Sequence, residues 1–122
     1  MDKTAIILGV GPAEGLGANL SMHAARAGLH VFISGRTESA IEKIASQIIN
    51  EGGKATAFCA DATDPEEVCS LIDRAEQAGP IDLAVYNAGN AFPGDFITMS
   101  PEYFEEAWTV CTFGGFLFSQ NV

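Results

Sequence analysis

The stretch ILGVGPAEGLGANL, residues 7–20, places four glycines within nine positions, between an apolar run and a helical pattern. Glycine lets a backbone turn sharply with positive φ and leaves no Cβ where a ligand must come close. A helix that starts directly after such a loop directs its free N–H groups and the positive end of its dipole at the same place. The stretch therefore predicts a strand, a phosphate-binding loop and a helix, in that order.

Short apolar runs and helical patterns continue to alternate along the chain. Ser39–Glu51 is the clearest helix, because Ile41, Ile44 and Ile48 recur at helical spacing before a Gly-Gly pair. Asp64 and Pro65 are typical of an N-cap and a first helical residue. Strands are predicted at Thr4–Leu8, His30–Ser34, Thr56–Cys59 and Ile81–Tyr86, and helices at Leu16–Ala27, Ser39–Glu51, Pro65 to Gly79, and from Pro101 onward with Phe104, Ala107, Trp108 and Cys111 on one face.

This alternation predicts the fold class. Strands that are apolar throughout, with amphipathic helices between them, indicate a parallel sheet that is covered on both faces. We expect an α/β fold: a Rossmann-type, doubly wound parallel sheet in a three-layer αβα arrangement, as one dinucleotide-binding domain over residues 1–122. Ligands of such sheets bind beyond the carboxyl ends of the strands, which is where the glycine loop lies.

Composition restricts the possible partners. The chain is 48% hydrophobic, so it can form a core, and its net charge of −10 disfavours binding to nucleic acid or to an anionic membrane. No apolar run approaches the length of about 18 residues that spans a bilayer. Cys59, Cys69 and Cys111 form no C-x-x-C pair, which is typical of reduced cytoplasmic thiols. Neither His23 nor His30 has ligand spacing to a cysteine, so no metal site is expected.

Four motifs in order resemble a known family. Gly11, Gly15 and Gly17 form G-x-x-x-G-x-G, Asp61 follows the third predicted strand, and Asn87-Ala88-Gly89 closes the fourth. The segment 108–116 has the pattern of a helix that precedes a fifth strand. Together they resemble the short-chain dehydrogenase/reductase family from about residue 5 to residue 118. The resemblance implies the strand order 3-2-1-4, a nicotinamide dinucleotide cofactor, a small-molecule substrate of unknown identity and a homo-oligomer.

The resemblance also assigns cofactor contacts. The glycine loop would bind the pyrophosphate, Asp61 and Ala62 the adenine, and the Asn-Ala-Gly segment the ribose. Either Gly9 or Gly11 can be the first glycine of the motif, the former with a loop two residues longer. The expected cofactor-binding residues are Gly9, Gly11, Gly15, Leu16, Gly17, Arg36, Thr37, Asp61, Ala62, Asn87, Ala88 and Gly89.

The end of the second strand bears on which dinucleotide binds. NAD-specific sites place an acid there for the ribose 2′-OH, whereas here Gly35 stands in that position. Arg36, with Thr37, could hold a 2′-phosphate. Glu14 in the loop would oppose such a phosphate if it faced the ribose. On balance the sequence favours NADP(H) over NAD(H).

The catalytic residues of the family are missing from this chain. The Tyr-x-x-x-Lys pair is absent, and Cys111, which we expect to be buried, occupies the position of the family's helical asparagine. We therefore expect the incomplete N-terminal part of a longer protein, without strand five onward. It would be the cofactor-binding half of an NADP(H)-dependent oxidoreductase that transfers hydride between nicotinamide and a carbonyl or alcohol, and inactive alone. The alternative is a dinucleotide-binding protein or fragment without catalysis. Phe92 and Phe96 hint at an apolar substrate wall.

Overall fold

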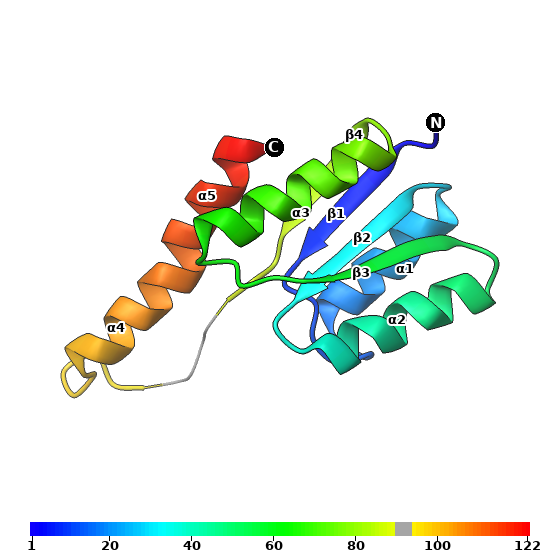
Figure 1. Ribbon diagram of the computed structural model, residues 1–122. Coiled ribbons are helices and arrows are strands. Elements are labelled where there is room, and N and C mark those ends of the chain that lie inside the picture. The colour runs from blue at the N-terminus through cyan, green and yellow to red at the C-terminus, as the bar shows by residue number, and fades with distance from the viewer. Residues whose placement is uncertain (90–93) are drawn as a thin grey trace.

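Strands and helices alternate in the computed structural model, which describes residues 1–89 and 94–122 (Figure 1). The first strand and the fourth have the bounds expected from the sequence, and the other ends differ by a residue or two. The elements are β1 (Thr4–Leu8), α1 (Leu16–Arg26), β2 (His30–Gly35), α2 (Glu38–Asn50), β3 (Lys54–Cys59), α3 (Pro65–Ala78), β4 (Ile81–Tyr86), α4 (Pro101–Trp108), the π-helical turn η1 (Thr109–Phe113) and α5 (Gly114–Asn121).

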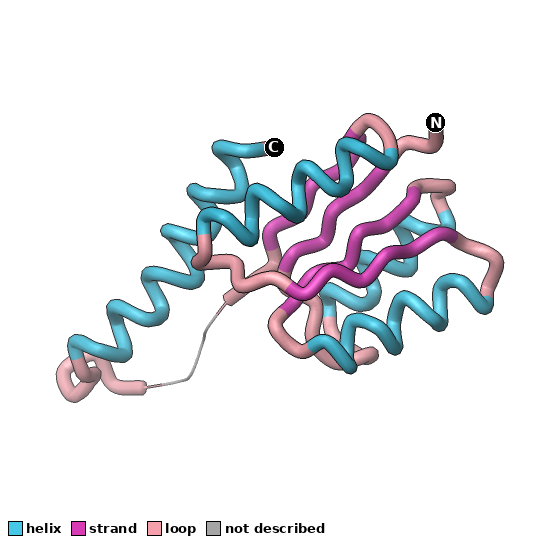
Figure 2. The backbone as a smooth tube through the Cα atoms, in the orientation of Figure 1, coloured by secondary structure: helices cyan, strands magenta, loops and turns pink. Residues whose placement is uncertain are grey.

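The strands form a parallel sheet in the order β3-β2-β1-β4, which confirms the predicted order. Ile6 of β1 lies opposite Phe32 of β2 on one side and Ala84 of β4 on the other. Helices α1 and α2 cover one face of the sheet, whereas α3 and α5 cover the other (Figure 2). The arrangement is the predicted three-layer αβα sandwich.

Strand β1 lies at the centre of the core. Its alternate residues Ala5 and Ile7 pack in the cluster formed with α1 and α2, and Ile6 and Leu8 pack in the cluster formed with α3 and α5. A strand that is buried on both faces needs apolar residues at every position. This explains why TAIIL reads as a continuous apolar run and not as an alternating one.

Side-chain caps set the starts of two helices. Asp64 accepts hydrogen bonds from the backbone N–H groups of Glu66 (2.9 Å) and Glu67 (3.3 Å), and Ser100 accepts one from Tyr103 (3.1 Å). The first of these caps is the one predicted from the Asp64-Pro65 pair. The Glu67 carboxylate binds the N–H of Asp61 (3.3 Å) and so connects α3 to the end of β3.

The last helix departs from its prediction. The prediction that Cys111 is buried is wrong, because this residue is exposed in η1. The apolar face of α4 is exposed as well, with Phe104 61% and Trp108 49% exposed. Helix α4 extends away from the sheet (Figure 1), and burial resumes in α5 at Gly114, Leu117 and Phe118, of which the last two pack on the α3 side of the sheet. Periodicity identified an apolar face but could not tell what that face would contact. In the described part of the chain, no helix is long and apolar enough to cross a membrane.

His30, the first residue of β2, provides a test of the packing at the amino ends of the strands, opposite the glycine loop. Its Nε2 lies 2.8 Å from Oγ1 of Thr56, and its ring stacks on Phe32 at 4.8 Å between centroids. Burial first, and then the positive charge of Lys54, lower the pKa of His30 below its ordinary value of 6.5. The unfolded chain therefore binds more protons than the folded chain once the pH falls below about 6.5.

We predict that the free energy of unfolding is highest above this pH and decreases as the pH falls toward the folded pKa of His30. Urea denaturation between about pH 7.5 and pH 5 measures the slope. His30→Gln should flatten it, because the titrating group is removed. His23→Gln, on the exposed side of α1, should keep the slope of the unaltered protein. Equal slopes in all three proteins would contradict the prediction.

Candidate functional site

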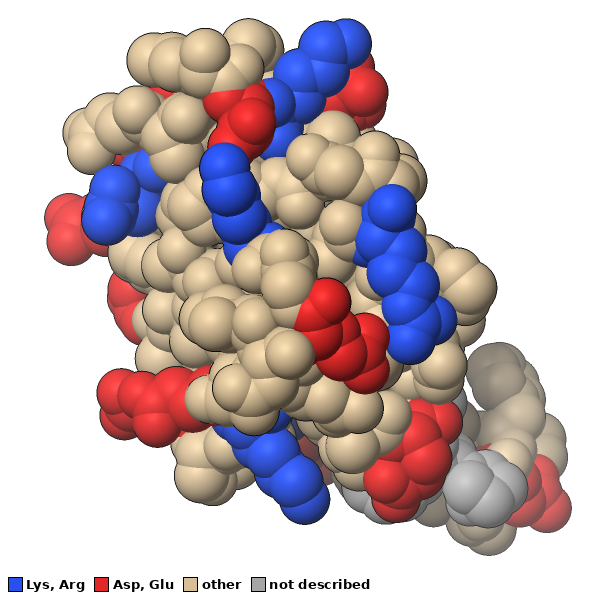
Figure 3. All heavy atoms as spheres, turned by 90° about the vertical axis from the view of Figure 1, so that its right-hand side faces the viewer, with Lys and Arg blue, Asp and Glu red and all other residues tan. Residues whose placement is uncertain are grey.

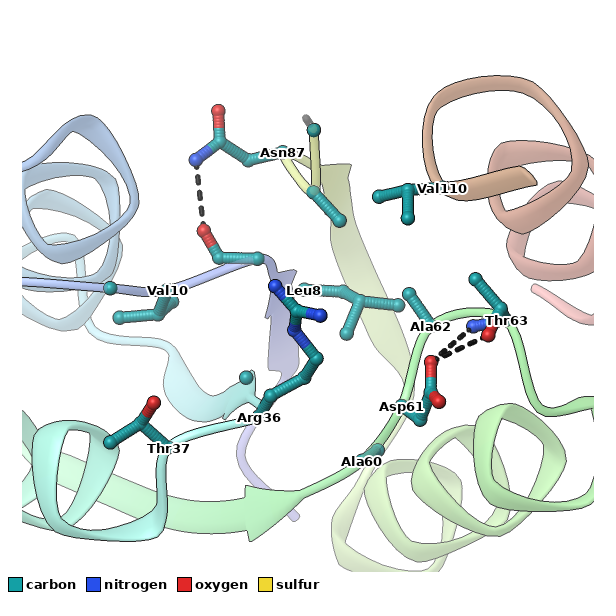
Figure 4. A pocket seen from close by; sticks show the side chains of 15 residues that line it. Leu8, Val10, Arg36, Thr37, Ala60, Asp61, Ala62, Thr63, Asn87 and Val110 are labelled. Carbon is teal, nitrogen blue, oxygen red and sulfur yellow. Dashed lines mark hydrogen bonds between the residues drawn. The ribbon is translucent and has the colours of Figure 1, made fainter. Parts of the chain in front are cut away.

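A cavity of about 320 Å³ opens at the carboxyl ends of the four strands (Figure 4). This is the edge at which doubly wound sheets bind ligands. The loops after β1, β2, β3 and β4 all contribute to it, together with η1. The lining residues are Leu8, Gly9, Val10, Gly11, Gly35, Arg36, Thr37, Ala60, Asp61, Ala62, Thr63, Asn87, Ala88, Gly89 and Val110.

Three backbone segments meet below the cavity with no room for a side chain. Gly9 has a φ of +108°, and a Cβ there would lie 2.2 Å from the backbone nitrogen of Ala88. A Cβ on Gly17 of α1 would lie 2.8 Å from the carbonyl oxygen of Gly9. These two glycines therefore bring the end of β1, the start of α1 and the segment after β4 into direct contact.

Asn87 stabilises this junction with two hydrogen bonds. Its backbone N–H donates to the carbonyl of Leu8 (2.7 Å), and its side-chain Nδ2 donates to the carbonyl of Gly9 (3.0 Å, Figure 4). Position 87 is thus fixed by the turn that follows β1. The neighbouring Ala88 and Gly89 are held at the cavity wall as a result.

A second close contact lies at the end of β2. A Cβ on Gly35 would be 2.4 Å from the carbonyl oxygen of Val10. The loop cannot easily move aside, because the N–H groups of Gly9 and Val10 both donate to the carbonyl of Ser34 (2.9 Å each). With the loop held in this way, position 35 has no space for a side chain. This is the position where an NAD-specific site would carry an acid.

Arg36 directs its guanidinium into the cavity, toward the end of β1 (Figure 4). Lys3, Arg26 and Lys54 each form an ion pair with a carboxylate, whereas none of the described carboxylates lies within 4.0 Å of Arg36. A guanidinium without an ion-pair partner in a concave site is suited to bind an anion. Thr37 lies beside it at the start of α2.

Asp61 faces Arg36 from the loop after β3. Its Oδ1 accepts hydrogen bonds from the backbone N–H (2.9 Å) and the hydroxyl (2.7 Å) of Thr63. The backbone bond first, then the hydroxyl bond, and further the positive charge of Arg36, lower the pKa of Asp61 below its ordinary value of 3.8. The cavity therefore has a fixed anion on the β3 side and a cation on the β2 side.

Most of the residues that the sequence singled out come together here, and some do not. Gly15 is the N-cap of α1, Leu16 is 64% exposed, and Gly17 lies below the loop, so none of the three lines the cavity. Glu14 does not line the cavity either. Phe92 lies outside the described residues, and Phe96 is 83% exposed.

Several lining residues were not identified from the sequence. Val10 contributes through the close approach of its carbonyl to Gly35, which no pattern of residue types reveals. Ala60 and Thr63 could have been found as the immediate neighbours of Asp61. Val110 reaches the cavity from η1, a turn that the helical periodicity of this segment did not indicate. Within the described residues, no group of three or more His, Cys, Asp or Glu could hold a metal ion.

Comparison with known proteins identifies the family. The family model described as short chain dehydrogenase matches residues 3–122, and the chain belongs to this family of dehydrogenases and reductases. It is 35% identical over 108 residues to an uncharacterized oxidoreductase of Mycobacterium tuberculosis, covering 88% of this chain and 40% of that protein. It is 37% identical over 101 residues to the oxidoreductase UcpA of Escherichia coli, covering 82% of this chain and 37% of that protein.

Solved structures agree with this assignment. The crystal structure of a hydroxysteroid dehydrogenase from Escherichia coli matches with a TM-score of 0.89 and 34% identity, over 98% of this chain and 50% of that one. The chain thus spans half or less of the length of these similar proteins.

The junction below the cavity can be tested with two alanine substitutions in one loop. We predict that Gly9→Ala lowers the free energy of unfolding by roughly 2–4 kcal/mol, because the methyl group meets the backbone of Ala88 and the φ is positive. Gly11→Ala should change it by less than about 1 kcal/mol, because nothing lies within 4 Å of its Cβ position. Chemical denaturation of both variants measures the difference, and equal losses would refute it.

Proposed function

We propose that the cavity binds a nicotinamide dinucleotide, NADP(H) in preference to NAD(H), and that the chain is the cofactor-binding part of an oxidoreductase. When bound, such a cofactor accepts or donates a hydride at its nicotinamide ring, toward an alcohol or carbonyl carbon of a small molecule. The observation that carries the proposal is the guanidinium of Arg36, directed into a cavity at the strand ends without an ion-pair partner among the described carboxylates. The names of the similar oxidoreductases support the reaction class.

The pyrophosphate would lie between the glycine loop and the start of α1. Gly15, as N-cap, has no side chain to accept the N–H groups of the first turn, so an anion can take that place. Gly11 lines the cavity with open space at its Cβ position, which gives a phosphate room to approach. Leu16 and Gly17 would contribute backbone N–H groups only.

The adenosine end would lie over β2 and β3. Arg36 and Thr37 would bind the 2′-phosphate, and the absence of an acid at Gly35 removes the usual partner of a free 2′-OH. Asp61, ionised and held by Thr63, would accept a hydrogen bond from the adenine amino group, with Ala62 against the ring. The Asn87–Gly89 segment would then line the nicotinamide ribose.

Cys111 favours a second candidate, a dinucleotide-binding protein without catalysis. A thiol is a weak hydrogen-bond donor and cannot replace the amide of the asparagine that the family has at this position. The two candidates differ in turnover. Hydride transfer from bound NADPH to a panel of aldehydes, ketones and quinones would support the oxidoreductase, whereas tight binding without transfer in the whole protein would support the second candidate.

Two further properties belong to the same proposal. The free cysteines are in keeping with a reducing compartment, so we expect a cytoplasmic protein. The exposed aromatic residues Phe104, Trp108 and Phe116 are in keeping with a homo-oligomer. Sedimentation analysis of the purified protein tests the second property.

Arg36→Ala is the direct test of cofactor preference. We predict that this substitution weakens the binding of NADPH by roughly 10- to 100-fold, because charge-assisted hydrogen bonds to the 2′-phosphate are lost. The binding of NADH should weaken by less than about threefold. Lys43→Ala, an equal loss of charge on the exposed side of α2, is the control and should change neither affinity. Calorimetric titration of the unaltered protein and both variants measures the affinities for the two cofactors, and an unchanged NADPH/NADH ratio in Arg36→Ala would exclude the 2′-phosphate role.

Gly11→Ala tests the pyrophosphate site independently of the adenosine end. We predict that it weakens NADPH and NADH alike, by about tenfold or more, because the methyl group occupies space that the phosphates need. Gly94→Ala adds the same methyl group at a glycine that also has open space around it but does not line the cavity. It should leave both affinities unchanged, and a selective loss of NADPH in Gly11→Ala would contradict the placement.

A further inference from the structure

The π-helical turn η1 is bonded to the end of β4. In a π-helical turn the backbone N–H of residue i+5 donates to the carbonyl of residue i, and such turns are frequent at functional sites. Here the N–H of Gly114 donates to the carbonyl of Thr109. The hydroxyl of Tyr86, the last residue of β4, donates to a second carbonyl of the turn, that of Val110. The sheet therefore supplies a hydrogen-bond donor to the backbone of η1.

Gly114 brings the end of this turn against the loop after β3. A Cβ on Gly114 would lie 2.1 Å from the Tyr86 hydroxyl and 3.0 Å from the carbonyl oxygen of Ala62. A Cβ on the next residue, Gly115, would lie 3.7 Å from the Tyr86 ring, which is an ordinary contact. Position 114 thus has no room for a side chain, whereas position 115 accepts a methyl group.

The Tyr86 side chain is held between these segments. Its ring packs on the buried Phe118 at 5.8 Å between centroids. Burial chiefly, and then the neighbouring Cys111 and Asp61, raise the pKa of Tyr86 to about 12. The hydroxyl therefore stays protonated and remains a donor over the whole physiological pH range. The contribution of Asp61 indicates that its carboxylate is close enough to act on this hydroxyl.

Two apolar side chains at this junction face the cavity. Val110 of η1 and Ala62 of the loop after β3 both line it, and Figure 4 shows them on the same side of it, away from Thr37. Asp61 lines the cavity next to Ala62, with its carboxylate fixed by Thr63. The contacts of Tyr86 therefore set how closely the Val110 wall approaches the Asp61–Ala62 segment.

We infer that Tyr86 is a positioning residue that holds η1 against the Asp61–Ala62 segment and so shapes the slot for the adenine base. Tyr86 does not line the cavity itself and acts through Val110. The inference rests on the proposed function, which assigns Asp61 and Ala62 to the adenine. It adds that recognition of the base depends on a side chain outside the cavity.

Hydrogen exchange without any ligand tests the first step, the bond from Tyr86 to η1. In Tyr86→Phe the backbone amides of residues 109–114 should exchange about fivefold faster, as expected for the loss of one neutral hydrogen bond. The amides of α1 should not change. Gly115→Ala alters the same region without displacing the hydroxyl and should not speed the exchange. Unchanged exchange of residues 109–114 in Tyr86→Phe would overturn the inference.

Discrimination between two bases tests the second step. The probes are NADPH and its hypoxanthine analogue, in which a carbonyl oxygen replaces the 6-amino group of adenine. The unaltered protein should bind NADPH about tenfold more tightly, because the carboxylate of Asp61 accepts a hydrogen bond from the amino group. In Tyr86→Phe the base is no longer held at this carboxylate, and the ratio of the two affinities should fall below about threefold.

Two glycine variants are the matched pair for this measurement. Gly114→Ala, which displaces the Tyr86 hydroxyl, should lower the ratio in the same way, whereas Gly115→Ala should retain the ratio of the unaltered protein. A merely structural role of Tyr86 would weaken both ligands equally. An unchanged ratio in Tyr86→Phe would therefore overturn the inference, even if both affinities fall.

The unaltered protein separates this inference from the proposed function. If it binds neither ligand, the dinucleotide proposal fails, and the role of Tyr86 fails with it. If it binds both ligands equally well, dinucleotide binding stands, but the adenine is not recognised at Asp61 and the role of Tyr86 is wrong. If it prefers NADPH and Tyr86→Phe keeps this preference, only the positioning role is wrong.

Discussion

The contact of three backbones at the end of β1 is the constraint on which the site depends. Gly9, Gly17 and the Asn87–Ala88 segment approach so closely that no Cβ fits at either glycine. The Asn87 amide then bonds the Gly9 carbonyl at 3.0 Å. Because α1 begins at this junction and β4 ends at it, its geometry determines where the N-terminus of α1 and the Asn-Ala-Gly segment face the cavity. A similar exclusion at Gly35, against the Val10 carbonyl, sets the distance from this loop to the end of β2.

The sequence predicted the sheet well for a physical reason. A central parallel strand is buried on both faces, so β1 consists of apolar residues apart from a hydrogen-bonded Thr4, and its bounds are visible without a structure. The strand order came from the resemblance and is confirmed. The glycine pattern also predicted a loop at the strand ends, but it could not tell which glycine makes a close backbone contact and which lines the cavity. Gly9 makes the close backbone contact, whereas Gly11 has open space and lines the cavity.

Prediction was poorest in the last helical segment. The spacing of Phe104, Trp108 and Cys111 is that of one helical face, yet these three residues are exposed. Periodicity describes a helix by itself, whereas burial depends on a partner surface that sequence spacing does not specify. The π-helical turn was missed for a related reason: its stabilising donor, the Tyr86 hydroxyl, comes from a residue 24 positions away in the chain. Only the glycine at position 114, directly opposite that hydroxyl, leaves a trace of the contact in the sequence.

The proposed anionic ligand would bind to a chain with a net charge of −10. Acidic and basic side chains are mixed over the face seen in Figure 3, and Lys3, Arg26 and Lys54 are each paired with a carboxylate. Exposed charges further away than about 10 Å are largely screened at an ionic strength of 0.1 M. A phosphate in the cavity would therefore experience mainly the local field of the α1 N-terminus, of Arg36 and of Asp61. The carboxylate of Asp61 is the one acidic group that lines the cavity within the described residues, and its bonds to Thr63 fix it on the β3 side. Local arrangement, and not net charge, makes the strand edge suitable for an anionic ligand.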